Sequence, residues 1–114
     1  MRKDDEIRLC HMRDAAREAL SFIEGKSRGD LDTDRQLVLS LVKEVEIIGE
    51  AAYRLSDESR GEFPRIPWQD IIGMRHRLVH AYFEINIEIL WQTINKDLPE
   101  LLAVLETSLP PAED

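Results

Sequence analysis

The sequence is poor in the residues that mark secreted, membrane-spanning or strand-rich proteins. It has one cysteine, Cys10, in 114 residues, so no disulfide can form within the chain, which favours a reducing compartment. Aromatic residues make up only 6%, whereas the straight-chain residues that favour helices are abundant. No apolar run is long enough to cross a bilayer, and the charged residues 1–8 do not resemble a signal peptide. These features predict a soluble, cytoplasmic protein without a membrane partner.

Positive charge is also scarce. The chain has 15 Lys and Arg against 23 Asp and Glu, which gives a net charge of −8 at pH 7. Binding to DNA or to nucleic acid in general is therefore not expected, because such binding depends on Lys and Arg that neutralise phosphates. A local basic site is still compatible with this total, since the net charge does not say where the charges cluster.

Apolar residues at helical spacing, in contrast, are plentiful. The composition, 43% hydrophobic and 33% charged, is typical of one globular domain over residues 1–114. The periodicity predicts helices over about 4–24, 33–55, 67–82 and from 87 onward. The last helix must kink or restart near Asp97, because Pro99 cannot donate a backbone hydrogen bond. With no alternating strand pattern, the predicted fold class is all-α, a four- to five-helix up-and-down bundle.

Single residues within these helices have predicted structural roles. Thr33 begins a Thr-x-x-Gln capping box for the second helix, and Asn86 is a good N-cap for the fourth. Gly49 lies inside the second helix at a cost of roughly 1 kcal/mol relative to Ala, and close approach of another helix would explain it. Trp68 and Trp91 are expected to anchor the core rather than to stack on bases.

The residues that could do chemistry are concentrated in residues 75–82, RHRLVHAY. On a continuous helix, Arg75 and Tyr82 are seven residues apart and share a face, and His80 reaches the same space if the helix ends there. An imidazole can take the proton of a ribose 2′-hydroxyl, and a guanidinium can hold the phosphate. The segment therefore suits RNA cleavage without a metal, and a symmetric dimer would supply a second copy of the sparse acid–base set.

Each of these residues also has a purely structural interpretation. Arg75 could form a salt bridge with Asp70 or Glu50. His80 could cap the C-terminal end of the third helix, where its charge favours the helix dipole. Tyr82 could be a core or interface aromatic with its hydroxyl at the edge. The histidines of the sequence show no metal-ligand spacing, so neither a metal nor another cofactor is predicted.

The chain resembles the HepT-like branch of the HEPN superfamily over about residues 5–108. The segments that carry the resemblance are IIGEAA at 47–52, PW at 67–68, IIGMRHRLVHAY at 71–82, Trp91, and DLPEL at 97–101. The third of these contains the Arg-x4-His-x-Tyr motif of the family, here Arg75, His80 and Tyr82. His76 departs mildly from the family pattern, which often has Asn or another polar residue at this position.

The resemblance implies an HEPN-like, homodimeric, metal-independent endoribonuclease toxin of a type II toxin–antitoxin system. Arg75 and His80 would be catalytic and line a cleft between the subunits, with RNA, expected to be tRNA, as substrate. The implied partner is an MNT nucleotidyltransferase-type antitoxin, bound in the dimer or in a higher assembly, that inactivates the toxin by AMPylation of Tyr82. The residues expected to support the catalytic pair are Glu50, His76 and Arg77.

A second function class stays open. The chain could be a non-catalytic helical binding module that docks a nucleotidyltransferase or a nucleotide, and its acidity and small number of catalytic groups favour this alternative. The two classes differ on expression: a toxin slows growth and His80→Ala relieves the effect, whereas a binding module is tolerated equally well with either residue.

Overall fold

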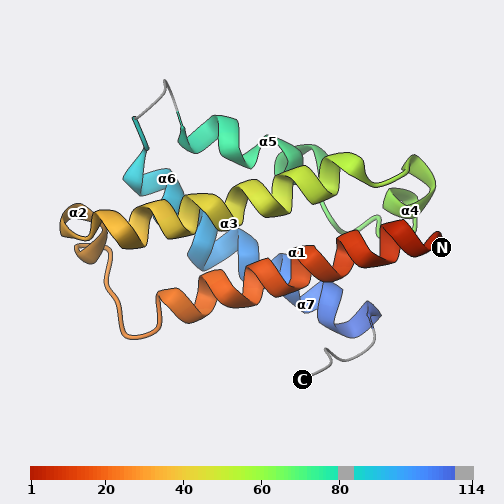
Figure 1. Cartoon of the computed structure of the whole chain (residues 1–114), viewed down its shortest axis with the longest axis horizontal. Coiled ribbons are helices and arrows are strands. Elements are labelled where there is room, and N and C mark those ends of the chain that lie inside the picture. The colour runs from red at the N-terminus through yellow and green to blue at the C-terminus, as the bar shows by residue number, and fades with distance from the viewer. Residues whose placement is uncertain (80–83, 110–114) are drawn as a thin grey trace.

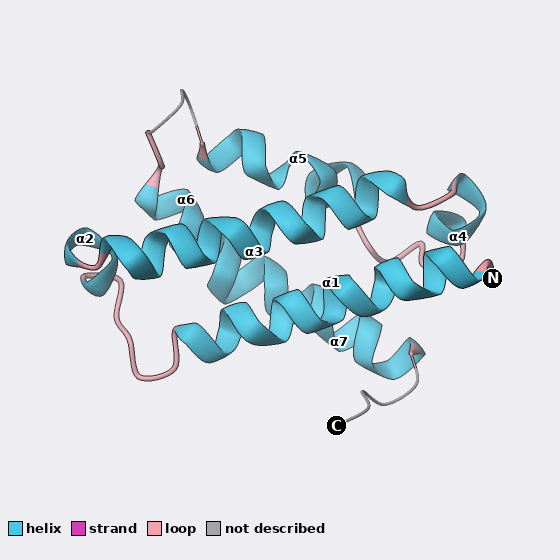
Figure 2. Ribbon diagram, in the orientation of Figure 1, coloured by secondary structure: helices cyan, strands magenta, loops and turns pink. Residues whose placement is uncertain are grey.

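The computed structural model of the chain describes residues 1–79 and 84–109, most of which lie in helices (Figures 1 and 2). Successive long segments run in opposite directions, and the described residues form no strand beyond one isolated bridge. The all-α, up-and-down prediction is therefore confirmed. The helical segments are α1 (Lys3–Phe22), α2 (Asp30–Thr33), α3 (Arg35–Arg54), α4 (Asp57–Gly61), α5 (Trp68–Leu78), α6 (Ile87–Gln92), the π-helical segment η1 (Thr93–Asp97) and α7 (Leu98–Ser108).

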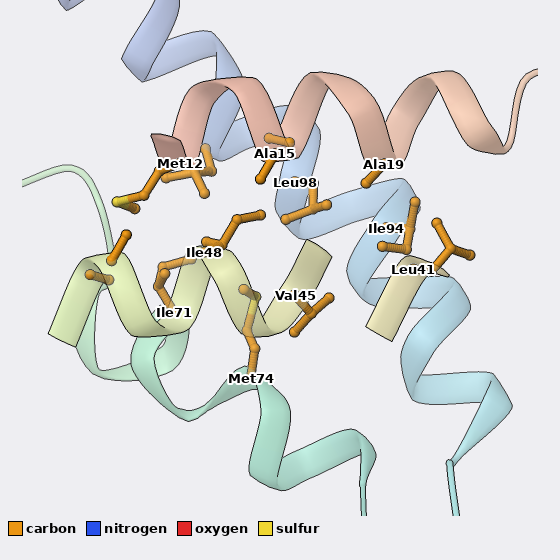
Figure 3. Close-up of a cluster of buried hydrophobic side chains, with 14 of the residues drawn as sticks. Met12, Ala15, Ala19, Leu41, Val45, Ile48, Ile71, Met74, Ile94 and Leu98 are labelled. Carbon is orange, nitrogen blue, oxygen red and sulfur yellow. The ribbon is translucent and has the colours of Figure 1, made fainter. Parts of the chain in front are cut away.

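The hydrophobic core lies where α1, α3, α5 and the run from α6 to α7 meet. Figure 3 shows side chains from all of these elements pointing into one interior. Each fully buried large apolar side chain contributes roughly 1.5–3 kcal/mol relative to its exposed state, so this cluster is the main source of stability. The largest fully buried side chains include Leu9, Met12, Leu41, Ile48, Met74, Leu78, Leu90, Ile94, Leu98 and Leu105.

The helix caps agree with the sequence at one start and differ at another. The Asn86 side chain accepts a hydrogen bond from the Ile89 N–H at 3.0 Å, so its predicted role as an N-cap is confirmed. The cap of α3 is Asp34 rather than Thr33, because Thr33 is the last residue of the short helix α2. Asp34 accepts a hydrogen bond from the Leu37 N–H at 3.0 Å, which satisfies one of the open donors at the helix start.

The third helix ends earlier than predicted. α5 stops at Leu78, and Val79 has extended backbone with φ −114° and ψ 102°. Val79 forms an isolated antiparallel bridge with Ile85, and the N–H of Asn86 donates to the Leu78 carbonyl at 2.7 Å. A β-branched residue such as Val79 favours this extended geometry. The predicted helix therefore ends at Leu78, and Val79 and Ile85 lie side by side next to its C-terminal end.

The predicted interruption near Asp97 is confirmed as the π-helical segment η1. The N–H of Leu98 donates to the carbonyl of Thr93, five residues earlier, instead of four as in an α-helix. Pro99 follows in the first turn of α7, where its missing N–H is tolerated. None of the helices within residues 1–79 and 84–109 is long and apolar enough to cross a membrane.

Candidate active site

Helices α1, α3 and α5 enclose a surface cleft of about 1010 Å³. It contains Arg75, the arginine singled out by the sequence, together with two of the three histidines of the chain, His11 and His76. Both histidines are exposed. The residues that line the cleft are Asp4, Ile7, Arg8, His11, Lys43, Glu46, Ile47, Gly49, Glu50, Ala51, Tyr53, Arg54, Ile72, Arg75 and His76.

The cleft carries more positive charge than the rest of the molecule. Its lining has four Lys and Arg against three Asp and Glu, a net charge of +1, whereas the whole chain has −8. A second groove of about 770 Å³, between α5, η1 and α7, has three cationic and three acidic side chains and so no net charge. The net charge of the sequence did not show where cations cluster. The lining residues show an excess of cations in the α1–α3–α5 cleft, which favours this cleft as an anion-binding site.

Arg75 is held in the cleft by a carboxylate from the neighbouring helix. Its Nε donates a hydrogen bond to Oε1 of Glu46 at 3.0 Å, and its side chain is 48% exposed. The partner is neither Asp70 nor Glu50, the two carboxylates predicted from the sequence. Because the bond uses Nε, the two terminal amino groups of the guanidinium keep four N–H donors for an anion.

The residues expected to support the catalytic pair separate onto two faces. His76 and Glu50 line the same cleft as Arg75, and Glu50 accepts a hydrogen bond from Arg54 at 2.8 Å. Arg77 lies in the groove between α5, η1 and α7, where it pairs with Asp70 at 3.6 Å. Two residues along an α-helix correspond to a rotation of about 200°, which places Arg77 on the opposite side of α5 from Arg75.

Gly49 lies at a close approach between α3 and α5. A Cβ added to it would lie 3.6 Å from the carbonyl oxygens of Ile71 and Ile72, at van der Waals distance from the backbone of α5. The close approach of another helix that the sequence analysis inferred for Gly49 is therefore found between α3 and α5. The approach brings Glu46, one turn earlier on α3, within reach of Arg75.

A buried carboxylate fixes the end of the cleft and was missed by the sequence analysis. Asp5 of α1 accepts hydrogen bonds from the hydroxyls of Ser56 and Ser59, both at 2.7 Å, and from the Ser56 N–H at 3.3 Å. These hydrogen bonds, with a smaller effect of Arg8, lower the pKa of Asp5 from 3.8 to about 2. Arg8 lies 3.4 Å from Asp5 and also donates to the Arg54 carbonyl at 3.2 Å. The network ties the start of α1 to the end of α3.

A second buried carboxylate, Glu44, lies outside the cleft in the middle of α3. Its Oε2 has no hydrogen-bond partner among the described residues. Burial, together with the neighbouring carboxyl of Glu18 on α1, raises the pKa of Glu44 from 4.5 to about 7. Glu44 and Glu18 face a shallow depression that also includes Phe22, Leu39 and other residues of the two helices.

The predicted catalytic histidine and the predicted modification site, His80 and Tyr82, lie outside the described residues. Their described neighbours, Val79 and Ile85, are paired next to the C-terminal end of α5. This places both flanks of the segment at the helix that carries Arg75. Within residues 1–79 and 84–109, no cluster of His, Cys, Asp and Glu side chains is arranged to hold a metal ion.

Comparison with known proteins decides the family. The chain matches the family model described as "Ribonuclease HepT-like" over residues 12–108. It belongs to the HepT-like family. A protein of Caldanaerobacter subterraneus subsp. tengcongensis, named "Putative RNase TTE0752", is 39% identical over 93 residues, 82% of this chain and 83% of that protein. A protein of Thermococcus cleftensis, named "Probable ribonuclease HepT", is 33% identical over 93 residues, 78% and 84% of the two chains.

The resemblance to the HEPN superfamily drawn from the sequence is thereby confirmed. No solved structure matches this HepT-like chain. The matched region contains every cleft residue contributed by α3 and α5, whereas the four from α1 precede it. Those four residues, Asp4, Ile7, Arg8 and His11, complete one wall of the cleft in this HepT-like protein.

Proposed function

We propose that this HepT-like ribonuclease cleaves RNA endonucleolytically in the α1–α3–α5 cleft without a metal ion. The observation that carries the proposal is the concentration of cations around Arg75 in an acidic chain. RNA binding needs local positive charge, and among the two largest hollows described only this cleft has an excess of it. The family assignment supplies the reaction class.

In the proposed mechanism, Arg75 holds the scissile phosphate through its terminal amino groups while Glu46 keeps the guanidinium in place. His80 takes the proton of the ribose 2′-hydroxyl, the 2′-oxygen bonds to phosphorus, and the bond to the 5′-oxygen breaks. A second imidazole protonates that leaving oxygen, and in a homodimer His80 of the other subunit supplies it. The products are a 2′,3′-cyclic phosphate and a free 5′-hydroxyl.

The family resemblance extends the proposal to substrate and regulation. The substrate is tRNA, and an MNT nucleotidyltransferase-type antitoxin inactivates the toxin by transferring AMP from ATP to the hydroxyl of Tyr82, which releases pyrophosphate. The added group would block the cleft by its bulk and by repulsion between its phosphate and the phosphates of RNA. Tyr82 follows His80 by two residues in the sequence, which supports a modification close to the proposed catalytic group.

The test is RNA cleavage in EDTA by purified, unmodified protein. Wild type, His80→Ala and Arg75→Ala are incubated with tRNA and with total RNA, after circular dichroism has confirmed folding. The matched control is Arg17→Ala, which removes another exposed ion pair, at 2.6 Å from Glu106 and outside the cleft. We expect discrete products from wild type and control, and cleavage reduced by roughly 100-fold or more in the two site variants. Equal cleavage by all four proteins would point to a contaminant.

One observation favours the competing function, a non-catalytic module that docks a nucleotidyltransferase or a nucleotide. Arg75 and Arg54 are already paired with Glu46 and Glu50, and the negative charge of each carboxylate offsets part of the attraction between the guanidinium and an RNA phosphate. If wild-type protein with unmodified Tyr82 cleaves nothing, and its expression slows growth no more than that of His80→Ala, the module replaces the nuclease as the proposed function.

A further inference from the structure

Tyr53 is an aromatic side chain that the fold does not explain. It lies near the end of α3 and is 67% exposed, whereas the other described aromatic residues are buried or half-buried. Trp68, for example, packs against the core and its Nε1 donates to the carbonyls of Arg60 and Phe63. A lone exposed aromatic ring is common on protein surfaces, so its meaning depends on its surroundings. Here the ring forms part of the wall of the candidate active site.

The position of Tyr53 along α3 fixes its place in the cleft. Tyr53 follows Glu46, Gly49 and Glu50 at spacings of seven, four and three residues, so all four share the helix face that lines the cleft. Seven residues correspond to about 10 Å along the helix axis. Because Glu46 holds Arg75, the backbone of Tyr53 lies about that far along α3 from the residue that binds the guanidinium.

Two cationic side chains line the same cleft as Tyr53. Arg54 is the next residue, and Arg8 of α1 donates to the Arg54 carbonyl at 3.2 Å. Both line the cleft with Tyr53. An aromatic face combined with backbone-neutralising cations is the arrangement by which proteins bind single-stranded nucleic acid.

We infer that Tyr53 is a stacking platform for one base of a single-stranded RNA whose phosphate Arg75 holds. This inference rests on the proposed function and adds the class of substrate to it. About 10 Å spans roughly three stacked nucleotides of one strand, and fewer when the strand is extended. A base can reach the ring only after it has left a duplex, so the site selects loops, ends and other unpaired segments.

The exposed ring could instead contact a second copy of this chain. Ile7, which lines the same cleft and is 45% exposed, would add apolar surface to such a contact. The proposed mechanism brings the His80 of a second subunit to this cleft but leaves the cleft open to RNA, so the ring of Tyr53 is assigned to the substrate. A phosphodiester backbone is complementary to the net positive charge of the lining.

The experiment measures binding separately from cleavage. A short, fluorescein-labelled 2′-O-methyl RNA lacks the nucleophilic hydroxyl, and its fluorescence anisotropy gives Kd for the single strand and for its duplex. Tyr53→Ala should weaken single-strand binding roughly 5- to 150-fold, and Tyr53→Phe should stay within about twofold of wild type because the ring is kept. The matched control is Leu39→Ala on the same helix, 48% exposed and outside the cleft, which should bind as wild type does.

Cleavage kinetics and sedimentation complete the test. With cleavable RNA, Tyr53→Ala should raise KM by a similar factor and leave kcat within about threefold, the pattern of lost binding rather than lost chemistry. Unchanged Kd and KM in Tyr53→Ala would overturn the inference while leaving the nuclease intact. Equal losses of RNA affinity in Tyr53→Ala and Tyr53→Phe would overturn it too. So would sedimentation showing that Tyr53→Ala weakens the dimer enough to account for the lost RNA binding. Wild-type binding without cleavage would instead contradict the proposed function alone.

Discussion

Two buried carboxylates in opposite halves of the α1–α3 pair have opposite properties. Asp5, 1% exposed, accepts hydrogen bonds from two serine hydroxyls and a backbone N–H, and its pKa falls to about 2. Glu44, 4% exposed, has an oxygen without a partner among the described residues and a second carboxyl beside it, and its pKa rises to about 7. Burial is similar at both positions, so the available donors decide which form of the carboxyl the fold prefers.

The difference also separates a firmly hydrogen-bonded end of the α1–α3 pair from a poorly satisfied site in the middle of α3. The Asp5 network adjoins the cleft through Arg8 and Arg54, so the hydrogen bonds that stabilise the fold also hold one end of the proposed active site. Glu44 lies away from the cleft, where a poorly satisfied group affects stability without disturbing the site. Two substitutions test this difference between Asp5 and Glu44, and two more test the wall of the cleft that α3 forms. We take the four from the largest expected effect to the smallest.

Asp5→Ala should have the largest effect because it leaves the hydroxyls of Ser56 and Ser59 without their acceptor. We expect a loss of about 2–4 kcal/mol in the free energy of unfolding, measured by urea denaturation at pH 7. The neighbouring, exposed Asp4→Ala is the matched control and should change stability by less than about 0.5 kcal/mol. Equal effects of the two substitutions would show that the network is not stabilising.

The same variant has a pH signature. A pKa lowered from 3.8 to about 2 means that the ionised form is preferred in the folded state. The stability that Asp5 contributes is therefore fully present above pH 3.8 and is lost as the pH falls toward 2. The difference between wild type and Asp5→Ala should shrink across that interval.

Glu44→Gln should act in the opposite direction. With a pKa raised from 4.5 to about 7, the stability linked to protonated Glu44 is present below pH 4.5 and lost as the pH rises to 7 and beyond. Above pH 7, the variant should be more stable than wild type by about 1–2 kcal/mol, less than the full pKa shift implies because the exposed Glu18 is screened by water. Near pH 4, wild type and variant should have equal stability. A gain that does not depend on pH would contradict this account.

Glu46→Gln tests a third carboxylate of α3, one that is partly exposed and paired with Arg75. The amide keeps an oxygen acceptor but removes the charge, so the guanidinium is held less firmly. We expect kcat/KM for RNA to fall about 2- to 10-fold, with little change in stability, as is usual for an exposed ion pair. Glu46→Ala, which removes the acceptor as well, should reduce kcat/KM further.

Gly49→Ala should have the smallest effect. Its Cβ would make ordinary contacts at 3.6 Å with α5, and alanine favours the helix by up to about 1 kcal/mol, so stability should be unchanged or slightly raised. Gly49→Leu should instead push α5 away from α3 and lower RNA cleavage. Unchanged cleavage in the leucine variant would show that the close approach does not position Arg75.

Local signals in the sequence predicted much of the fold. The apolar periodicity, the Asn86 cap and the break before Pro99 each depend on residues a few positions apart. All three are confirmed, except that the helix predicted over 67–82 ends at Leu78. The cap of α3 was misassigned because a one-turn helix ends at Thr33 and leaves Asp34 as the cap. Periodicity alone could not show this, since the two residues are adjacent and both are good caps.

The site was predictable only in part. Residue types pointed to Arg75, but its partner Glu46 is 29 residues away, and the sequence does not say which turn of α3 faces α5. The Asp5 network spans 51 and 54 residues and left no local pattern. The end of α5 at Leu78 depends on pairing of the chain beyond the helix, which helical periodicity does not report.

The π-helical segment η1 determines which side of the run from α6 to α7 faces the core. Leu90, Ile94 and Leu98 are each four residues apart, and all are fully buried. In an ideal α-helix a spacing of four overshoots one turn by about 40°, so three such residues would drift about 80° around the axis. The wider turn of η1 absorbs this drift and keeps one edge of the run facing α1 and α3. A chain one residue shorter within η1 would keep α6 and α7 in phase as a regular α-helix, apart from the clash that Pro99 introduces.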